Sequence, residues 1–136
     1  MKFSDVIGNS YAINRIRQMI DTDTLPHALL LHGLPGVPKL ALARAAVQYL
    51  HCTNRSNGEP CGCCPACLQH QSFNHGDTYF SFPIVKSGEN PTSSDFMSEW
   101  KNFLSENEVE DFQKWTAYLS KENAQPIICQ PESDRI

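Results

Sequence analysis

The 136-residue chain lacks three features that would each indicate a class of protein. It has no apolar run near the roughly twenty residues that a helix needs to cross a bilayer. Its start, Met-Lys-Phe-Ser-Asp, has no apolar core of a secretory signal. Its 11 Lys and Arg residues are outnumbered by 15 Asp and Glu residues, so no broad basic face indicates strong nucleic-acid binding. We therefore predict a cytoplasmic protein with no membrane partner.

Catalytic constellations are also absent from the sequence. No Ser–His–Asp or Cys–His arrangement has a cue that would orient a base toward a nucleophile, so we predict no catalytic residue. His27 and His32 flank an apolar run and are interpreted as structural. The chain ends at Ile136, barely a turn after the helix-start signal Pro-Glu at 131–132. We therefore expect a fragment of a longer protein.

A phosphate-binding loop is almost complete at residues 33–40, Gly-Leu-Pro-Gly-Val-Pro-Lys-Leu. The P-loop pattern G-x-x-x-x-G-K-[ST] follows a strand and opens a helix. Here Pro38 stands at the second glycine and Leu40 at the hydroxyl residue. Proline has no N–H for a phosphate, and leucine has no oxygen for a magnesium ion. The candidate nucleotide-binding residues are Gly33, Gly36 and Lys39, and we predict that their site is non-functional.

Hydrophobic periodicity predicts an α/β fold. The all-apolar run at 28–31 predicts a strand buried on both faces of a parallel sheet. A helix is predicted to follow it from Lys39 to about Leu50, and this strand–loop–helix order is typical of a P-loop sheet with flanking helices. An earlier helix, starting after Asn9, is predicted to bury one apolar stripe. That stripe consists of Ile13, Ile16 and Ile20.

The second half of the chain has a different pattern. Residues 78–82 predict a short strand that ends at a proline. Beyond it, aromatic residues recur at helical spacing, and we interpret them as core packing and not as a ligand site. The first stripe consists of Phe96, Met97, Trp100, Phe103 and Leu104, and the second of Val109, Phe112, Trp115 and Leu119.

Four cysteines have the spacing of a metal site, C-x8-C-x2-C-x2-C. Two C-x2-C steps place thiolates on one zinc ion without strain, and a four-thiolate site leaves no open position for water. We predict one structural zinc ion in a module at about residues 52–67. Cys63 could substitute for a neighbour, Cys129 is isolated, and His70 is interpreted as a surface residue. The predicted ligands are Cys52, Cys61, Cys64 and Cys67.

The order of these motifs resembles the N-terminal AAA+ module of bacterial DNA polymerase III clamp-loader subunits. Asp-Val-Ile-Gly at 5–8 and Leu-Pro-His-Ala-Leu-Leu at 25–30 precede the loop, and His-Gly-Asp at 75–77 follows the cysteines. The resemblance covers residues 3 to about 83, with departures at Asn9, where the family commonly has Gln, and Gly76, where it usually has Pro. It implies that residues 1–136 form a partial AAA+ domain with an inserted zinc module.

The resemblance also implies partners and a function. The gamma/tau subunits hydrolyse ATP through an intact P-loop, whereas delta-prime often has a degenerate loop and acts as a stator in the ring. The loop here fits delta-prime, so we expect a non-hydrolysing subunit that binds gamma/tau and delta. It would act on the sliding clamp and primed DNA through the complex. Neither an acidic magnesium motif nor a Ser-Arg-Cys arginine-finger motif is present, as expected if both lie beyond Ile136.

Two alternatives remain open. The chain could belong to an ATP-hydrolysing subunit of the gamma/tau type, against which Pro38 and Leu40 argue. It could also be a zinc-containing nucleic-acid-binding module. The acidic balance and the lack of Lys/Arg clusters near the cysteines make that the weakest reading.

Overall fold

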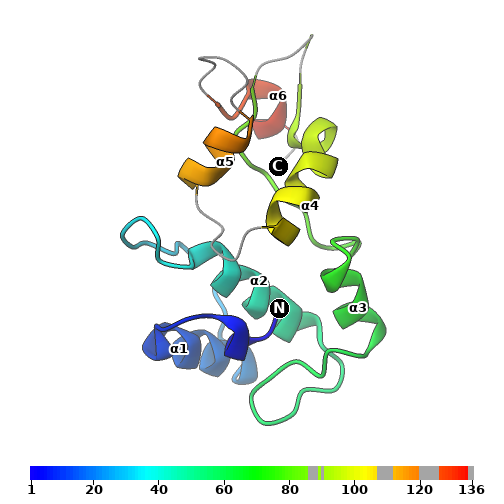
Figure 1. Ribbon diagram of the computed structural model, residues 1–136. Coiled ribbons are helices and arrows are strands. Elements are labelled where there is room, and N and C mark those ends of the chain that lie inside the picture. The colour runs from blue at the N-terminus through cyan, green and yellow to red at the C-terminus, as the bar shows by residue number, and fades with distance from the viewer. Residues whose placement is uncertain (86–88, 90, 107–111, 120–125, 135–136) are drawn as a thin grey trace. The chain divides into compact units, whose positions relative to one another are not determined.

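The computed structural model describes residues 1–85, 89, 91–106, 112–119 and 126–134. The chain forms two compact units, Met1–Thr78 and Tyr79–Ile136. Figure 1 shows the helices of both units. No helix among the described residues is long and apolar enough to cross a membrane.

The first unit is built from helices. A short 3-10 helix, η1 (Phe3–Asp5), precedes α1 (Ser10–Asp21), α2 (Lys39–His51) and α3 (Pro65–Gln71). The apolar stripe predicted on α1 is confirmed, because all three of its isoleucines are buried. They pack with η1 and with small residues of α2, of which Ala45 is fully buried. The core of this unit is therefore a contact between helices.

The carboxyl end of α2 is held by a polar cluster. The Tyr49 hydroxyl donates a hydrogen bond of 2.8 Å to Asp21 at the end of α1. Arg55 donates from Nε to the Tyr49 carbonyl and from Nη2 to the Leu50 carbonyl, at 2.8 and 2.7 Å. These carbonyls belong to the last turn, which lacks partners within the helix. The cluster thus fixes the end of α2, where the cysteine-rich segment begins.

The strand predicted at residues 28–31 does not form. These residues have no regular secondary structure, and within the described part of the chain the β-bridges join Ser56 to Glu59 and Ile84 to Ile127. The parallel sheet is therefore not shown. A strand needs a neighbouring strand to satisfy its backbone N–H and C=O groups, and no described segment supplies one.

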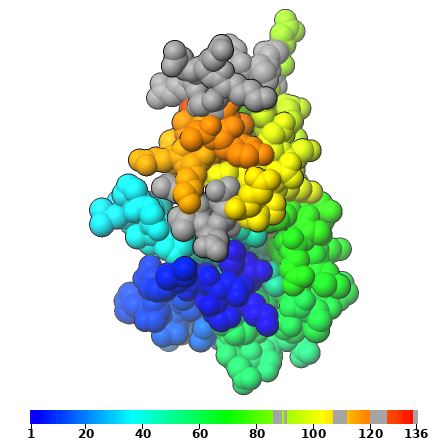
Figure 2. Space-filling model, in the orientation of Figure 1, coloured from blue at the N-terminus to red at the C-terminus, as the bar shows by residue number. Residues whose placement is uncertain are grey.

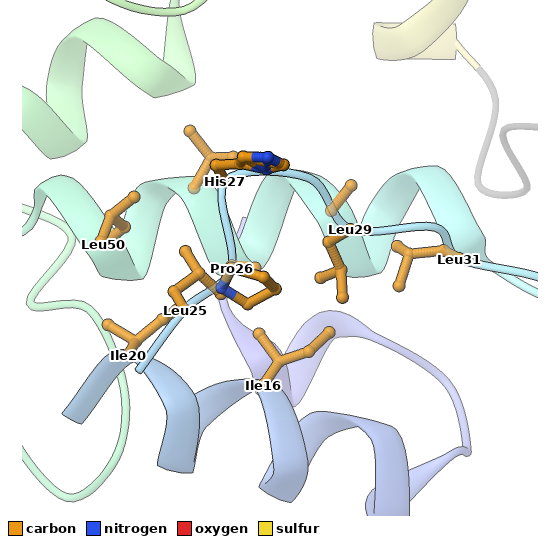
Figure 3. Close-up of a pocket in the computed structure, with 11 residues that line it drawn as sticks. Ile16, Ile20, Leu25, Pro26, His27, Leu29, Leu31 and Leu50 are labelled. Carbon is orange, nitrogen blue, oxygen red and sulfur yellow. The ribbon is translucent and has the colours of Figure 1, made fainter. Parts of the chain in front are cut away.

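The same segment covers an apolar groove between α1 and α2 (Figure 3). Leu29 and Leu31 line a cavity of about 260 Å³ together with Ile16 and Ile20 of α1. Leu30, between them, is 87 % exposed. Leu29 is itself 47 % exposed and Leu31 is half-buried, so the side of this segment that faces the groove is only partly covered. Burial on both faces is not shown, because nothing described in this unit covers the Leu30 side.

The second unit contains η2 (Ser93–Phe96), α4 (Met97–Glu106), α5 (Phe112–Leu119) and α6 (Gln130–Ser133). The predicted strand at 78–82 is not formed. The aromatic core is confirmed around Trp100, Phe103 and Trp115, which are buried, whereas Phe112 is 56 % exposed and Val109 lies outside the described residues. Phe82 stacks on Trp100 with ring centroids 4.3 Å apart, and Trp100 meets Trp115 edge to face at 4.8 Å. Such pairs stabilise a core beyond their buried area.

Buried polar groups join α6 to η2 in this unit. Glu132, 1 % exposed, accepts a hydrogen bond of 2.8 Å from the Ser93 backbone N–H. The Ser93 hydroxyl accepts from the Phe82 N–H and donates to the Phe82 carbonyl, both at 3.0 Å. Loss of one partner from such a buried set leaves the other unsatisfied.

We predict that Glu132→Ala destabilises the second unit by about 1–3 kcal/mol, because the buried Ser93 N–H loses its acceptor. Both tryptophans of the chain lie in this unit, so urea unfolding followed by tryptophan fluorescence reports on it. The matched control is Glu99→Ala on the exposed side of α4. A midpoint shift no larger than that of the control would contradict the role of Glu132.

Candidate functional site

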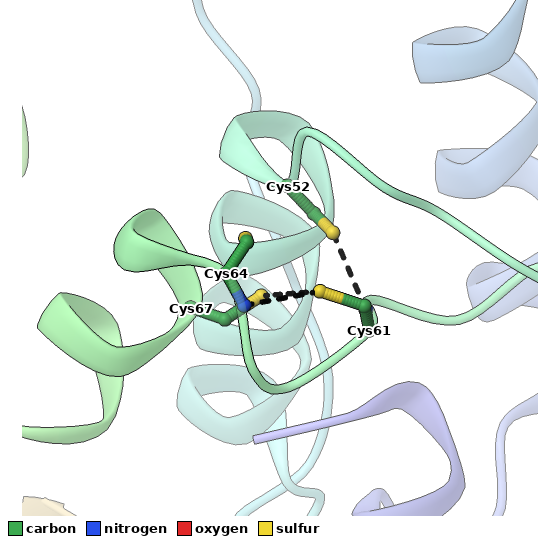
Figure 4. A group of neighbouring side chains, drawn as sticks. All are labelled: Cys52, Cys61, Cys64 and Cys67. Carbon is green, nitrogen blue, oxygen red and sulfur yellow. Dashed lines mark hydrogen bonds between the residues drawn. The ribbon is translucent and has the colours of Figure 1, made fainter.

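The four predicted cysteines converge in the first unit (Figure 4). Cys52 directly follows α2, Cys61 and Cys64 lie in the connecting loop, and Cys67 lies on α3. One sulfur from each lies within 4.8 Å of every other. Residues from two helices and a loop are therefore brought to one point, as a metal centre requires.

The separations suit a tetrahedral metal ion. The Cys61 and Cys67 sulfurs are 4.0 Å apart. Two thiolates bound to one zinc ion with bonds of about 2.3 Å lie about 3.8 Å apart. The Cys61 backbone N–H donates to the Cys52 sulfur, and the Cys64 N–H donates to the Cys61 sulfur, both at 3.3 Å. The residues fit a four-thiolate zinc ion, which would cross-link α2 and α3 and leave no catalytic position open.

The pKa values of the cysteine thiols are shifted in opposite directions by their surroundings. Backbone N–H groups of Cys67 and Thr53 lower the pKa of Cys64 to about 5. The backbone N–H groups of Cys63 and Cys64 likewise lower the pKa of Cys61. Burial instead raises the pKa of Cys67 to about 12. The loop thus favours thiolates, the form that binds metal, while Cys67 needs the charge of the ion to lose its proton.

A tight turn within the module positions the loop. Ser56 and Glu59 exchange backbone hydrogen bonds of 3.0 and 2.9 Å. Asn57 and Gly58 between them both have positive φ, +53° and +72°, which is the two-residue hairpin turn that Asn-Gly favours. The Asn-Gly pair at 57–58 is the signal in the sequence for this turn.

Glu59 connects this turn to the N-terminus of the chain. Its carboxylate accepts hydrogen bonds from the Phe3 and Ser4 N–H groups at 2.8 and 3.0 Å. Figure 2 shows the N-terminal residues, in dark blue, meeting the cysteine-rich segment, in green. The cysteine module is therefore packed on the helical core of the first unit.

The remaining predicted residues near the module have distinct positions. Cys63 is exposed and lies outside the group of four sulfurs, and Cys129 is buried in the second unit. His70 is half-buried and lies against two other histidines. Burial lowers the pKa of His70 to about 4, and its ring contacts His51 and His75. Sequence reasoning missed this histidine cluster, since its members are 19 and 5 positions apart.

Two backbone N–H groups of the loop at residues 33–40 donate hydrogen bonds to carbonyls of the same loop. The Val37 N–H donates to the Leu34 carbonyl at 3.3 Å, and the Lys39 N–H donates to the Val37 carbonyl at 2.7 Å. Pro38, with φ −75° and ψ 63°, is the centre of this second turn, which has the dihedrals of an inverse γ-turn. A phosphate would need these N–H groups, which here bond to the loop itself.

Lys39 is also directed to the loop. Its Nζ donates to the carbonyls of Gly33 and Leu34, at 3.3 and 2.9 Å. Gly36 has φ +83°, so its role is to permit the turn. The adjoining cavity, between the loop and α1, has a volume of about 160 Å³, below the roughly 300 Å³ at which ligand pockets begin. The three candidate nucleotide-binding residues thus lie in a loop whose donors bond to its own carbonyls, called the closed loop below.

Comparison with known families gives a match to "DNA polymerase III, delta subunit" over residues 8–135. The chain belongs to this family. It is 42% identical over 57 residues to DNA polymerase III subunit delta' of Yersinia pestis, a match that covers 42% of this chain and 17% of that protein. It is 35% identical over 80 residues to subunit delta' of Escherichia coli (strain K12), covering 59% of this chain and 23% of that protein.

A related subunit is similar to a comparable degree. DNA polymerase III subunit gamma of Buchnera aphidicola subsp. Baizongia pistaciae is 31% identical over 77 residues, covering 57% of this chain and 21% of that protein. The chain thus spans only about a fifth of the length of these relatives. No solved structure matches it.

We predict that the four-cysteine centre retains one zinc ion per chain through extensive dialysis, and that Cys67→Ser loses it. The matched control Cys63→Ser keeps the metal, because Cys63 lies outside the cluster. Elemental analysis measures the zinc, and cobalt substitution reports thiolate ligation through charge-transfer absorption.

Removal of the zinc should also have a local effect, because α1 and α2 have their own apolar contact. Amide hydrogen exchange should accelerate at residues 52–67 while the buried face of α1 stays protected. Unchanged exchange at 52–67, or disulfides among the four cysteines, would contradict a structural metal.

Proposed function

We propose that this chain is part of a structural, non-hydrolysing subunit of the bacterial replicative clamp loader, of the delta-prime type. Its partners would be the gamma/tau and delta subunits in a cytoplasmic complex. Through that complex it would assist the loading of the sliding clamp on primed DNA. Membership of the DNA polymerase III delta-subunit family supports the assignment to this machinery.

The closed loop at residues 33–40 is the observation that favours the structural role. Relatives named delta' and relatives named gamma match at similar identity, so the choice rests on chemistry. Pro38 offers no N–H, Leu40 offers no oxygen, and Lys39 donates to loop carbonyls. A loop of this kind retains the place of a P-loop without its phosphate and magnesium ligands.

We further propose that residues 1–136 are part of an N-terminal AAA+ domain into which the zinc module at about 52–67 is inserted. The extended segment at 28–31 would then be a strand of the domain's parallel sheet. Its exposed Leu30 supports this proposal, because a neighbouring strand or helix layer would bury that side.

Nucleotide binding tests the structural role directly. We predict no saturable binding of Mg-ATP at concentrations up to about 1 mM, since the loop lacks free donors and a magnesium ligand. Isothermal titration calorimetry measures it, with a gamma/tau subunit as the positive control. Lys39→Ala should leave both ATP binding and turnover at the background of the wild type. Micromolar affinity in the wild type would instead support an ATP-hydrolysing subunit.

Assembly tests the proposed partners. The protein, expressed at its full encoded length and mixed with the gamma/tau and delta subunits of its own source, should co-elute with them on size exclusion. The reconstituted complex should load the sliding clamp, and omission of this subunit should reduce loading by at least about tenfold. Failure to co-elute would overturn the clamp-loader role, whatever the result with ATP.

A further inference from the structure

We propose that His51, His70 and His75 form a second metal site, separate from the four cysteines, for a borderline divalent cation such as Zn²⁺. His51 is the last residue of α2, His70 lies on α3, and His75 lies in the loop after it. One ligand atom from each lies within 4.8 Å of the other two. Three of the five histidines in the chain thus meet at one point of the first unit.

The rings are stacked face to face. The centroids of His70 and His75 are 4.2 Å apart with an angle of 11° between the planes, and those of His51 and His75 are 4.3 Å apart with 4° between them. Stacking brings the ring nitrogens of separate elements close together without apolar residues between them. The cluster therefore offers several imidazole nitrogens in a small volume.

The closest pair already has nearly the separation of metal ligands. His51 Nδ1 lies 2.8 Å from His70 Nε2, so one nitrogen donates its proton to the other. Two imidazole nitrogens on a tetrahedral zinc ion, with bonds of 2.0–2.1 Å, lie about 3.3 Å apart. For a cation to bind between them, the donor ring must carry its proton on its other nitrogen. The two facing nitrogens must also separate by about half an ångström and turn their lone pairs toward the ion.

The third histidine joins by rotation of its ring, because its plane is within 4° of that of His51 and 11° of that of His70, and imidazole lone pairs lie in the ring plane. The Asp77 N–H donates to His75 Nδ1 at 3.3 Å, a long contact that a metal bond can replace. All three side chains are half-buried, so an ion could enter from solvent. The cluster is placed by two helices that the cysteine centre also joins, because Cys52 follows His51 and Cys67 precedes His70 by one turn.

Donor type separates the two sites. Imidazole suits Zn²⁺, Ni²⁺, Cu²⁺ and related ions, whereas four thiolates form a closed site for zinc. Three neutral ligands leave at least one coordination position for water and bind less tightly than four thiolates. We therefore expect a weaker, exchangeable ion that ties the loop after α3 to the end of α2.

The experiment is a zinc titration of wild-type protein whose cysteine centre is already loaded. Equilibrium dialysis against micromolar Zn²⁺ should give two equivalents per chain in the wild type and one in His70→Gln. His75→Gln, in a loop where folding is least affected, should bind the second ion at least about tenfold more weakly. The matched controls His27→Gln and His32→Gln, both exposed and outside the cluster, should keep two equivalents.

Imidazole ¹⁵N NMR of the wild type makes the test independent of the variants. Addition of the second zinc equivalent should shift the nitrogens of His51, His70 and His75 and leave those of His27 and His32 unchanged. One equivalent only in the wild type, or a second equivalent retained in His70→Gln, would overturn the site. The stacked histidines would then be a hydrogen-bonded cluster without metal.

Discussion

Burial of one face of α2 is the interaction on which the rest of the first unit depends. Ala41 and Ala45 let α2 approach the isoleucine stripe of α1 closely, and Tyr49 fixes the far end through Asp21. Helix α2 begins at Lys39, within the loop at residues 33–40, and Cys52 follows its last residue. A shift of α2 would therefore displace both candidate sites at once.

The two ends of α2 have different chemistry. At the amino end, backbone N–H groups beside Pro38 donate hydrogen bonds within two tight turns, and the Lys39 ammonium donates to loop carbonyls. At the carboxyl end thiolates and imidazoles converge on two groups of potential metal ligands. Metal ligation and a closed loop both restrict motion.

Much of the local organisation could be predicted from the sequence. The α1 stripe, the aromatic core around Trp100 and the helix start near Pro131 follow from periodicity and from proline's preference for the first helical turn. The convergence of four cysteines follows from their short spacing. The sheet could not be predicted in the same way, because residues 28–31 become a strand only beside a partner and no described segment provides one.

The sequence by itself determined which chemistry is available: a phosphate loop without two of its ligands, and four thiols within sixteen positions. Only the tertiary structure decided where that chemistry meets. His51 lies 19 positions before His70, and it meets His70 and His75 because α2 and α3 pack at one end. Lys39 looks like a phosphate ligand in the sequence, yet the folded loop directs it to carbonyls. Spacing along the chain reports contacts within one turn or loop, whereas contacts between elements depend on how those elements pack.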